Sequence, residues 1–183
     1  MSSRPVISVF GSNHPVPGEP DYAVAYELGR RLAEAGLTVA TGGYTGTMEA
    51  VSCGASEAGG HVIGVTCDEI EAWRPGRPNP WVAQEIRYRT MWRRLEHLVS
   101  ENDGAVALPG GVGTLAEVSA VWNRLQTNAM APRAFVLLGD FWRRAMEAFV
   151  DPAYVPIPHQ QLLLWAGTPL EAVEIIQRAL NRG

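Results

Sequence analysis

The sequence has no lysine, only two cysteines and no apolar stretch as long as the ~18 residues of a membrane span. Its 15 strongly basic residues are all arginines, and 19 Asp and Glu leave a net charge of −4, which gives no overall attraction for nucleic acid or an anionic membrane. Cys53 and Cys67 lack a CxxC or Cys/His spacing, so we expect neither a disulfide framework nor a metal site. The first apolar run, Val6 to Phe10, is too short for a signal peptide. These absences predict a cytoplasmic protein without metal, nucleic-acid or membrane partners.

Length and composition fit one globular domain. The chain has 183 residues, of which 46% are hydrophobic and 19% are charged, close to the average for globular proteins. A chain of this length buries roughly two-thirds or more of its unfolded surface in one core. We therefore expect residues 1–183 to form a single domain.

Short apolar runs alternate with longer segments of helical period along the chain. This alternation predicts an α/β fold, a three-layer Rossmann-like parallel sheet with helices on both faces. The predicted strands are residues 6–10, 38–41, 61–65, 105–108 and 134–138. The predicted helices are about 21–35, 47–58, 90–101, 113–126, 141–150 and 169–180. Residues 66–89 carry three prolines and no clear period, so we expect a long, partly ordered loop there.

Two glycine-rich turns stand where a strand should become a helix: Thr41-Gly-Gly-Tyr-Thr-Gly-Thr47 and Pro109-Gly-Gly-Val-Gly-Thr114. A helix N-terminus offers unpaired N–H groups and about half a positive charge, and glycine lets an anion approach the backbone. Both turns open at the carboxyl edge of a parallel sheet, where ligands of open α/β folds bind. The pattern thus favours a phosphate site over turns that only shape the backbone. The candidate phosphate-binding residues are Gly11, Ser12, Gly42, Gly43, Gly46, Thr47, Pro109, Gly110, Gly111, Gly113 and Thr114.

Glu117 and Arg94 are each open to two interpretations. Thr114 and Glu117 have the spacing of a capping box, and on spacing alone this favours a Glu117 that only bonds the backbone at the helix start over a functional carboxyl. Arg94 ends an arginine-rich run from Arg87, which by itself indicates a solvated face, or alternatively a cationic patch for phosphate. Three nearby tryptophans are each more typical of core packing than of stacking on a base. They are Trp73, Trp81 and Trp92.

The turns and the run Met91-Trp-Arg-Arg94 resemble the LONELY GUY family, long labelled lysine decarboxylases, whose signature PGGxGTxxE matches Pro109 to Glu117 at every fixed position. The resemblance spans about residues 6–138. It implies a phosphoribohydrolase that releases a free base and ribose 5-phosphate from a nucleoside 5′-monophosphate, typically a cytokinin nucleotide. It also implies a homodimer or larger assembly, no cofactor, and catalytic roles for Arg94 and Glu117.

Two positions depart from the hydrolase pattern. Leu95 stands where the family has a lysine, and Glu49 replaces a glycine near the first glycine turn. Both departures resemble a sister group that includes molybdenum-cofactor carrier proteins, which bind a phosphorylated pterin without hydrolysing a glycosidic bond. The alternative function is therefore a non-catalytic carrier of that cofactor or of another phosphorylated heterocycle.

The helix that contains Trp122 and Arg124 is the predicted homodimer face. Val118, Val121, Trp122 and Leu125 supply more apolar surface than one face of a helix needs. Such an excess often marks an interface.

Overall fold

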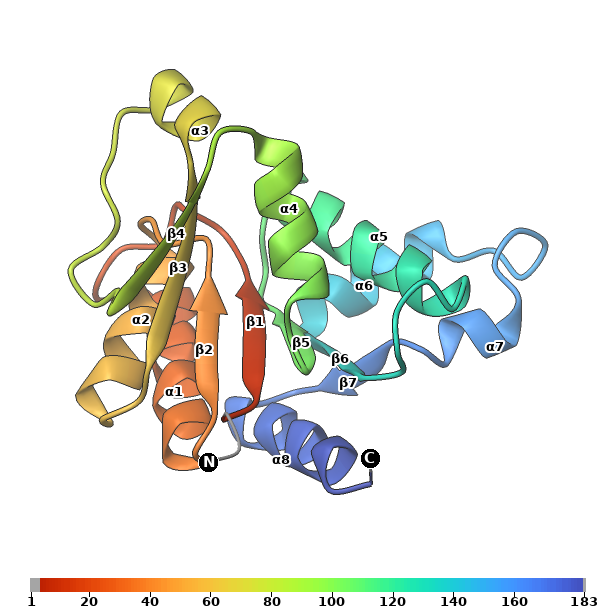
Figure 1. Ribbon diagram of the computed structural model, residues 1–183. Helices are drawn as coiled ribbons and strands as arrows, with labels where there is room; N and C mark the ends of the chain where they lie inside the picture. Colours follow the sequence, from red (N-terminus) through yellow and green to blue (C-terminus); the bar gives the residue numbers. More distant parts are fainter. Residues whose placement is uncertain (1–3, 183) are drawn as a thin grey trace.

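A computed structural model describes residues 4–182 and shows a parallel seven-stranded sheet between two layers of helices (Figure 1). The strands are β1 (Val6–Phe10), β2 (Thr38–Thr41), β3 (Val62–Cys67), β4 (Gln84–Tyr88), β5 (Gly104–Ala107), β6 (Ala134–Leu138) and β7 (Leu164–Ala166). Their order across the sheet is β4-β3-β2-β1-β5-β6-β7. Every neighbouring pair is parallel. The predicted α/β fold is thereby confirmed.

Helices cover both faces of this sheet. They are α1 (Pro20–Glu34), α2 (Thr47–Glu57), α3 (Asp68–Trp73), α4 (Met91–Ser100), α5 (Val112–Gln126), α6 (Asp140–Phe149), α7 (Ile157–Gln160) and α8 (Pro169–Leu180). One core lies between the sheet and α1, α2 and α8, and a second lies between the sheet and α4, α5 and α6. Because both faces are covered, the central strands β1, β2, β5 and β6 are almost entirely buried and mostly apolar.

Helix α1 shows how local sequence sets these boundaries. Pro20 stands in its first turn, where the missing N–H has no helical partner to lose, and Asp21 complements the helix dipole there. Gly36 follows the helix with φ of 78°, a left-handed conformation that favours glycine, and its N–H donates to the Ala33 carbonyl. The chain then turns directly into β2.

The sequence prediction is wrong for part of residues 66–89. This stretch contains α3 and the edge strand β4, not only loop. β4 has the polar sequence Gln-Glu-Ile-Arg-Tyr and pairs only with β3, so it never needs the apolar run that marks a central strand. The four-residue helix α7 and the three-residue edge strand β7 are also not predicted from the sequence.

The strand order reverses beside β1, which lies between β2 and β5. In parallel sheets a crevice opens outside the carboxyl ends of the strands at such a switch point. The turns that follow β1, β2 and β5 all lie at this edge, so the two glycine turns share one side of the sheet, as predicted. Within residues 4–182, no helix combines the length and the apolar character needed to cross a membrane.

Candidate ligand-binding site

The turn between β2 and α2 packs against the loop that follows β1. Both the N–H and the hydroxyl of Thr47 donate to the Ser12 carbonyl, at 2.8 and 2.9 Å. A Cβ at Gly46 would lie 2.4 Å from that same carbonyl oxygen, and one at Gly11 would lie 2.2 Å from the Thr47 hydroxyl. These glycines allow the two segments to touch. Ser12 thus already accepts both donors of Thr47 in this arrangement, and a role of Thr47 in phosphate binding stays a prediction.

Gly42 and Gly43 have different structural roles in the same turn. A Cβ at Gly42 would lie 1.9 Å from the guanidinium NH2 of Arg94, so the absence of a side chain leaves room for that group. Gly43 has φ of 79°, and its N–H donates to the Thr41 hydroxyl at 3.1 Å. The β2–α2 turn thus leaves room for the Arg94 guanidinium, which packs against its backbone.

The turn between β5 and α5 is open. Gly111 and Gly113 are exposed, and a Cβ built on either would meet nothing within 4 Å. Within residues 4–182, the N–H groups of Val112, Gly113 and Thr114 have no recorded acceptor, and the first helical bond runs from the Leu115 N–H to the Gly111 carbonyl. The 15-residue helix α5 therefore presents free donors and the positive end of its dipole to solvent. This turn is the candidate anion site.

Pro109 and Gly110 belong to the same turn but are less exposed than Gly111 and Gly113. Pro109 and Gly110 are only partly exposed. A Cβ at Gly110 would lie 2.1 Å from the Thr114 hydroxyl, so Gly110 allows the chain to fold tightly over the start of α5. Thr114 itself is only 4% exposed.

The structure does not support the capping-box interpretation of Glu117. Helix α5 begins at Val112, its N-cap is Gly111, and no side chain caps it. Thr114 is already inside the first turn, and Glu117 lies in the second. The carboxyl is thus free to act on the site.

Glu117 instead faces Arg94 of α4. The distance between Glu117 Oε1 and Arg94 NH1 is 4.0 Å, and each side chain is 12% exposed. The Arg94 Nε donates to the Val65 carbonyl at 2.7 Å, and NH2 donates to the Gly42 carbonyl at 3.3 Å. The guanidinium also lies over the Tyr44 ring, 5.8 Å from its centroid. Arg94 is therefore fixed by β3 and the β2–α2 turn, and its remaining nitrogen points to the carboxyl.

Burial raises the pKa of the Glu117 carboxyl to about 7, and the positive charge of Arg94 partly opposes this rise. Loss of hydration disfavours the charged form of a carboxyl, whereas a nearby cation favours it. A carboxyl with this pKa exists in both protonation states near neutral pH. Such a group is suited to acid–base or electrostatic roles in a reaction.

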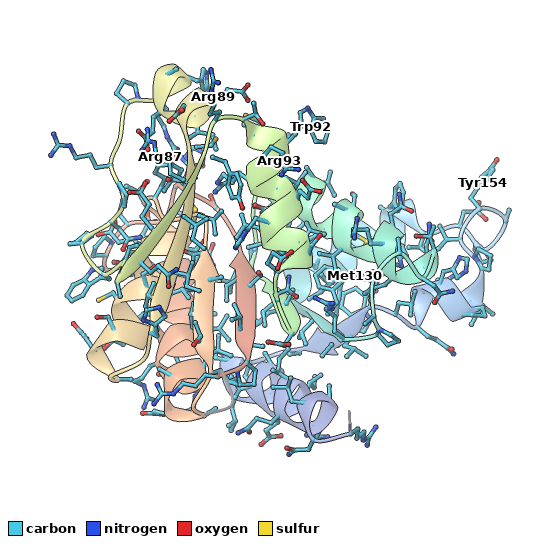
Figure 2. All side chains as sticks on the ribbon, viewed as in Figure 1. Arg87, Arg89, Trp92, Arg93, Met130 and Tyr154 are labelled. Atoms are coloured by element: carbon cyan, nitrogen blue, oxygen red, sulfur yellow. The ribbon has the colours of Figure 1, made fainter. Side chains whose placement is uncertain are left out.

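The rest of the arginine-rich run does not join Arg94. Arg87 forms ion pairs with Asp68 at 2.7 Å and Glu71 at 2.6 Å, and Arg93 pairs with Glu96 at 2.6 Å. Figure 2 shows Arg87 beside the edge strand and Arg93 at the start of α4, both on the outside of the molecule. The run is thus a solvated face with one exception. Arg94 alone in the run contacts the site.

The core-packing expectation for the tryptophans is wrong in two cases. Trp73 is 81% exposed and Trp92 is 78% exposed. Trp92 extends from the start of α4 into solvent (Figure 2). Trp81 is partly buried.

The two departures from the hydrolase pattern lie in α4 and α2, not in the open turn between β5 and α5. Leu95 packs against the core between the sheet and α4 to α6. Glu49 is in the first turn of α2. Burial raises the pKa values of Tyr22 and Cys53, and the negative charge of Glu49 adds to both rises. The charge of Glu49 is therefore felt by Tyr22 on α1.

The apolar residues of α5 do not form the surplus surface that the predicted dimer face requires. Val118, Val121, Trp122 and Leu125 are all at most 7% exposed within a single chain. The Trp122 indole N–H donates to the His159 carbonyl at 2.8 Å. These apolar side chains pack against α6 and the segment around α7. A homodimer stays a prediction.

Sequence reasoning misses two residues of this site, Tyr44 and Asn79. Tyr44 lies within the first glycine turn and is 4% exposed beneath Arg94. Asn79 is 7% exposed, although Pro80 directly after it and Arg77 two residues before it are exposed. The signal for Asn79 is its place between two prolines inside a long loop, which is weak without the fold.

Comparison with known proteins gives a consistent result. Residues 48–176 match the family described as "Possible lysine decarboxylase". A probable cytokinin riboside 5′-monophosphate phosphoribohydrolase of Oryza sativa is 29% identical over 171 residues, which cover 88% of this chain and 67% of that protein.

Two solved structures are similar over nearly their whole length. The molybdenum cofactor carrier protein of Chlamydomonas reinhardtii has a TM-score of 0.76 at 26% identity, covering 98% of this chain and 99% of that one. The molybdenum cofactor binding protein of Rippkaea orientalis shares the fold with a TM-score of 0.77 at 24% identity, with the same coverage. The family match, the PGGxGTxxE motif at the switch point and these likenesses agree: this chain belongs to the lysine decarboxylase-like family of LONELY GUY type.

Proposed function

We propose that this protein hydrolyses the N-glycosidic bond of a nucleoside 5′-monophosphate and releases the free base and ribose 5-phosphate. The observation that carries the proposal is the buried Arg94–Glu117 pair beside the open N-terminus of α5. A phosphate and a sugar need these two environments side by side. The first is a set of free backbone donors, and the second is a carboxyl that can meet a positive charge.

In this proposal the 5′-phosphate binds the N–H groups of Val112, Gly113 and Thr114, where the helix dipole favours an anion. The ribose then lies toward Glu117, one turn further along α5. As the bond between C1′ and the base nitrogen breaks, positive charge develops on the ribose and negative charge on the base. Water adds to C1′, one of its protons is released, and the base nitrogen takes up a proton. Ionised Glu117 stabilises the ribose cation or orients the water, which typically contributes about 10² to 10⁴ in rate.

Arg94 has two roles in this arrangement. Its charge holds part of the Glu117 population ionised near neutral pH, because it opposes the effect of burial. Its NH1 is also placed to hold an oxygen of the substrate, since guanidinium groups bind such oxygens strongly. The rice relative, which is named a phosphoribohydrolase of a nucleoside monophosphate, supports this assignment.

The second candidate function is a carrier of molybdenum cofactor or another phosphorylated heterocycle. It is favoured by one observation: the likeness to the Chlamydomonas carrier extends over 99% of that chain, whereas only 67% of the rice protein is matched. A carrier would use the same open turn for its phosphate and would need no ionisable carboxyl. In either case we infer a phosphorylated small-molecule ligand, no protein-bound cofactor for catalysis, a cytoplasmic location and a homodimer or larger assembly.

One experiment separates the two functions. Purified protein is incubated with AMP, and adenine and ribose 5-phosphate are quantified by chromatography. Release of both in equal amounts, lost in Glu117→Gln, supports the enzyme. Tight binding of AMP or of a pterin phosphate without release of base would reject hydrolysis and support the carrier.

A further inference from the structure

Asn79 is a buried amide in the loop between α3 and β4. Its side-chain Nδ2 donates to the carbonyls of Gly43 and Tyr44 at 3.1 and 2.9 Å. Its backbone N–H donates to the Gly43 carbonyl as well, at 2.8 Å. Its own Oδ1 accepts from the Trp81 N–H at 3.2 Å. Asn79 therefore fastens its loop to the β2–α2 turn through hydrogen bonds to two successive carbonyls.

The turn that Asn79 holds is also the turn that holds Arg94. Gly42, one residue before the first of these carbonyls, accepts a hydrogen bond from the Arg94 guanidinium. Tyr44, whose carbonyl Asn79 binds, places its ring beneath the same guanidinium. Gly43 between them has a left-handed φ of 79°, so this segment has many alternative conformations when nothing fixes it. The hydrogen bonds of Asn79 help to fix one of them, together with the hydrogen bonds between the Tyr44 hydroxyl and the Cys67 backbone.

We propose that Asn79 is a positioning residue that keeps Arg94 opposite Glu117 by holding the carbonyls of Gly43 and Tyr44. Asn79 itself does not face the carboxyl. Its effect passes through the backbone of residues 42–44 to the guanidinium. The importance of this effect for turnover rests on the proposed function, whereas the positioning of Arg94 does not.

The test measures the pKa of the Glu117 carboxyl, so it does not require that the protein turns over a substrate. Within residues 4–182, burial raises the pKa of this carboxyl and the positive charge of Arg94 lowers it. The full-length chain is labelled with ¹³C at glutamate side-chain carboxyls and titrated by NMR, and the Glu117 signal is assigned by its loss in Glu117→Gln. Arg94→Met measures the whole influence of the arginine charge.

We expect Asn79→Ala to raise the titration midpoint of Glu117, in the same direction as Arg94→Met and by no more. Asn79→Ser is the second variant, because a small polar side chain suits the buried position but supplies no amide NH₂ group. The matched control is Arg77→Ala in the same loop, since Arg77 is exposed and has no hydrogen bond or ion pair recorded within the described residues. Its midpoint should equal that of the unmodified protein.

An unchanged or lowered midpoint in a folded Asn79 variant would overturn the proposal. The same holds if Arg94→Met leaves the midpoint unchanged, because Arg94 would then not act on Glu117. If the protein proves to be a carrier and hydrolyses nothing, the NMR result still decides whether Asn79 positions Arg94. Failure of the proposed function is therefore distinguishable from failure of this inference.

Discussion

The guanidinium NH1 of Arg94 lies 4.0 Å from the carboxyl oxygen of Glu117, although the two residues belong to different helices, α4 and α5. The distance is longer than that of a direct hydrogen bond. The two charges therefore interact electrostatically, but the two groups form no direct hydrogen bond. An oxygen atom of a ligand or water can take up the donor that Arg94 presents.

Neutralising Glu117 should affect turnover more than binding. In Glu117→Gln the shape is kept and the negative charge is lost, so an interaction made chiefly in the transition state disappears. We expect kcat for a nucleoside monophosphate to fall by about 10² or more with little change in ground-state affinity. Steady-state kinetics and calorimetric binding measure the two effects. A fully active variant would remove Glu117 from the mechanism.

The stability of the protein should depend on pH through the same carboxyl. Its pKa is about 7 when folded and 4.5 as the ordinary value, so between these values the folded chain retains a proton that the unfolded chain has lost. The free energy of unfolding should thus fall as pH rises from about 4.5 to about 7, by on the order of 3 kcal/mol.

Urea unfolding at a series of pH values in this window measures that slope. Glu117→Gln has no proton to lose, so its slope should be smaller than that of the unmodified protein. Equal slopes for the two proteins would contradict the raised pKa.

Gly42→Ala should disturb Arg94 while the fold persists. The new Cβ would lie 1.9 Å from the guanidinium NH2 and 2.6 Å from the Met48 sulfur. Both atoms are at the ends of long side chains, so they can move, but Arg94 then loses its hydrogen bond to the Gly42 carbonyl. We expect kcat/KM to fall by about 10²-fold, because small displacements of catalytic groups have effects of this size. In an Arg94→Met background the same substitution should add little, since the displaced group is already absent. Additive losses in this double-mutant cycle would argue against the mechanism.

Gly113→Ala should separate ligand binding from stability. A Cβ at Gly113 meets nothing within 4 Å, and alanine is favoured over glycine inside a helix by about 0.5 to 1 kcal/mol. The melting temperature should be unchanged or slightly higher. If phosphate binds the N–H groups at the start of α5, the added methyl group obstructs it and the affinity for AMP should fall. Unaltered affinity would place the phosphate elsewhere.

A liganded crystal structure gives the direct test of that site. We expect a phosphate oxygen within hydrogen-bond distance of backbone N–H groups between Gly110 and Thr114. A phosphate bound only at the β2–α2 turn would be inconsistent with the hydrogen bonds that already occupy Thr47.

The sequence by itself determined the alternation of buried strands and helices, since runs such as Val6 to Phe10 and helical spacing in Pro20 to Glu34 are local properties of the chain. It also determined that two glycine turns meet at one edge of a parallel sheet, and the Pro109 to Glu117 motif indicated the family. The edge strand β4 was not predicted, because a strand paired on one side only does not need an apolar run and β4 has none.

Only the tertiary structure decided which of these features are open to solvent and which are occupied by contacts within the chain. Gly46 and Gly113 each precede the threonine in similar motifs, yet a Cβ at Gly46 would lie 2.4 Å from the Ser12 carbonyl oxygen, whereas one at Gly113 would meet nothing within 4 Å. Spacing likewise cannot tell a capping Glu117 from one that is buried beside Arg94. The difference arises from contacts between segments far apart in the chain, which set burial, free donors and pKa values, and local sequence patterns do not encode those contacts.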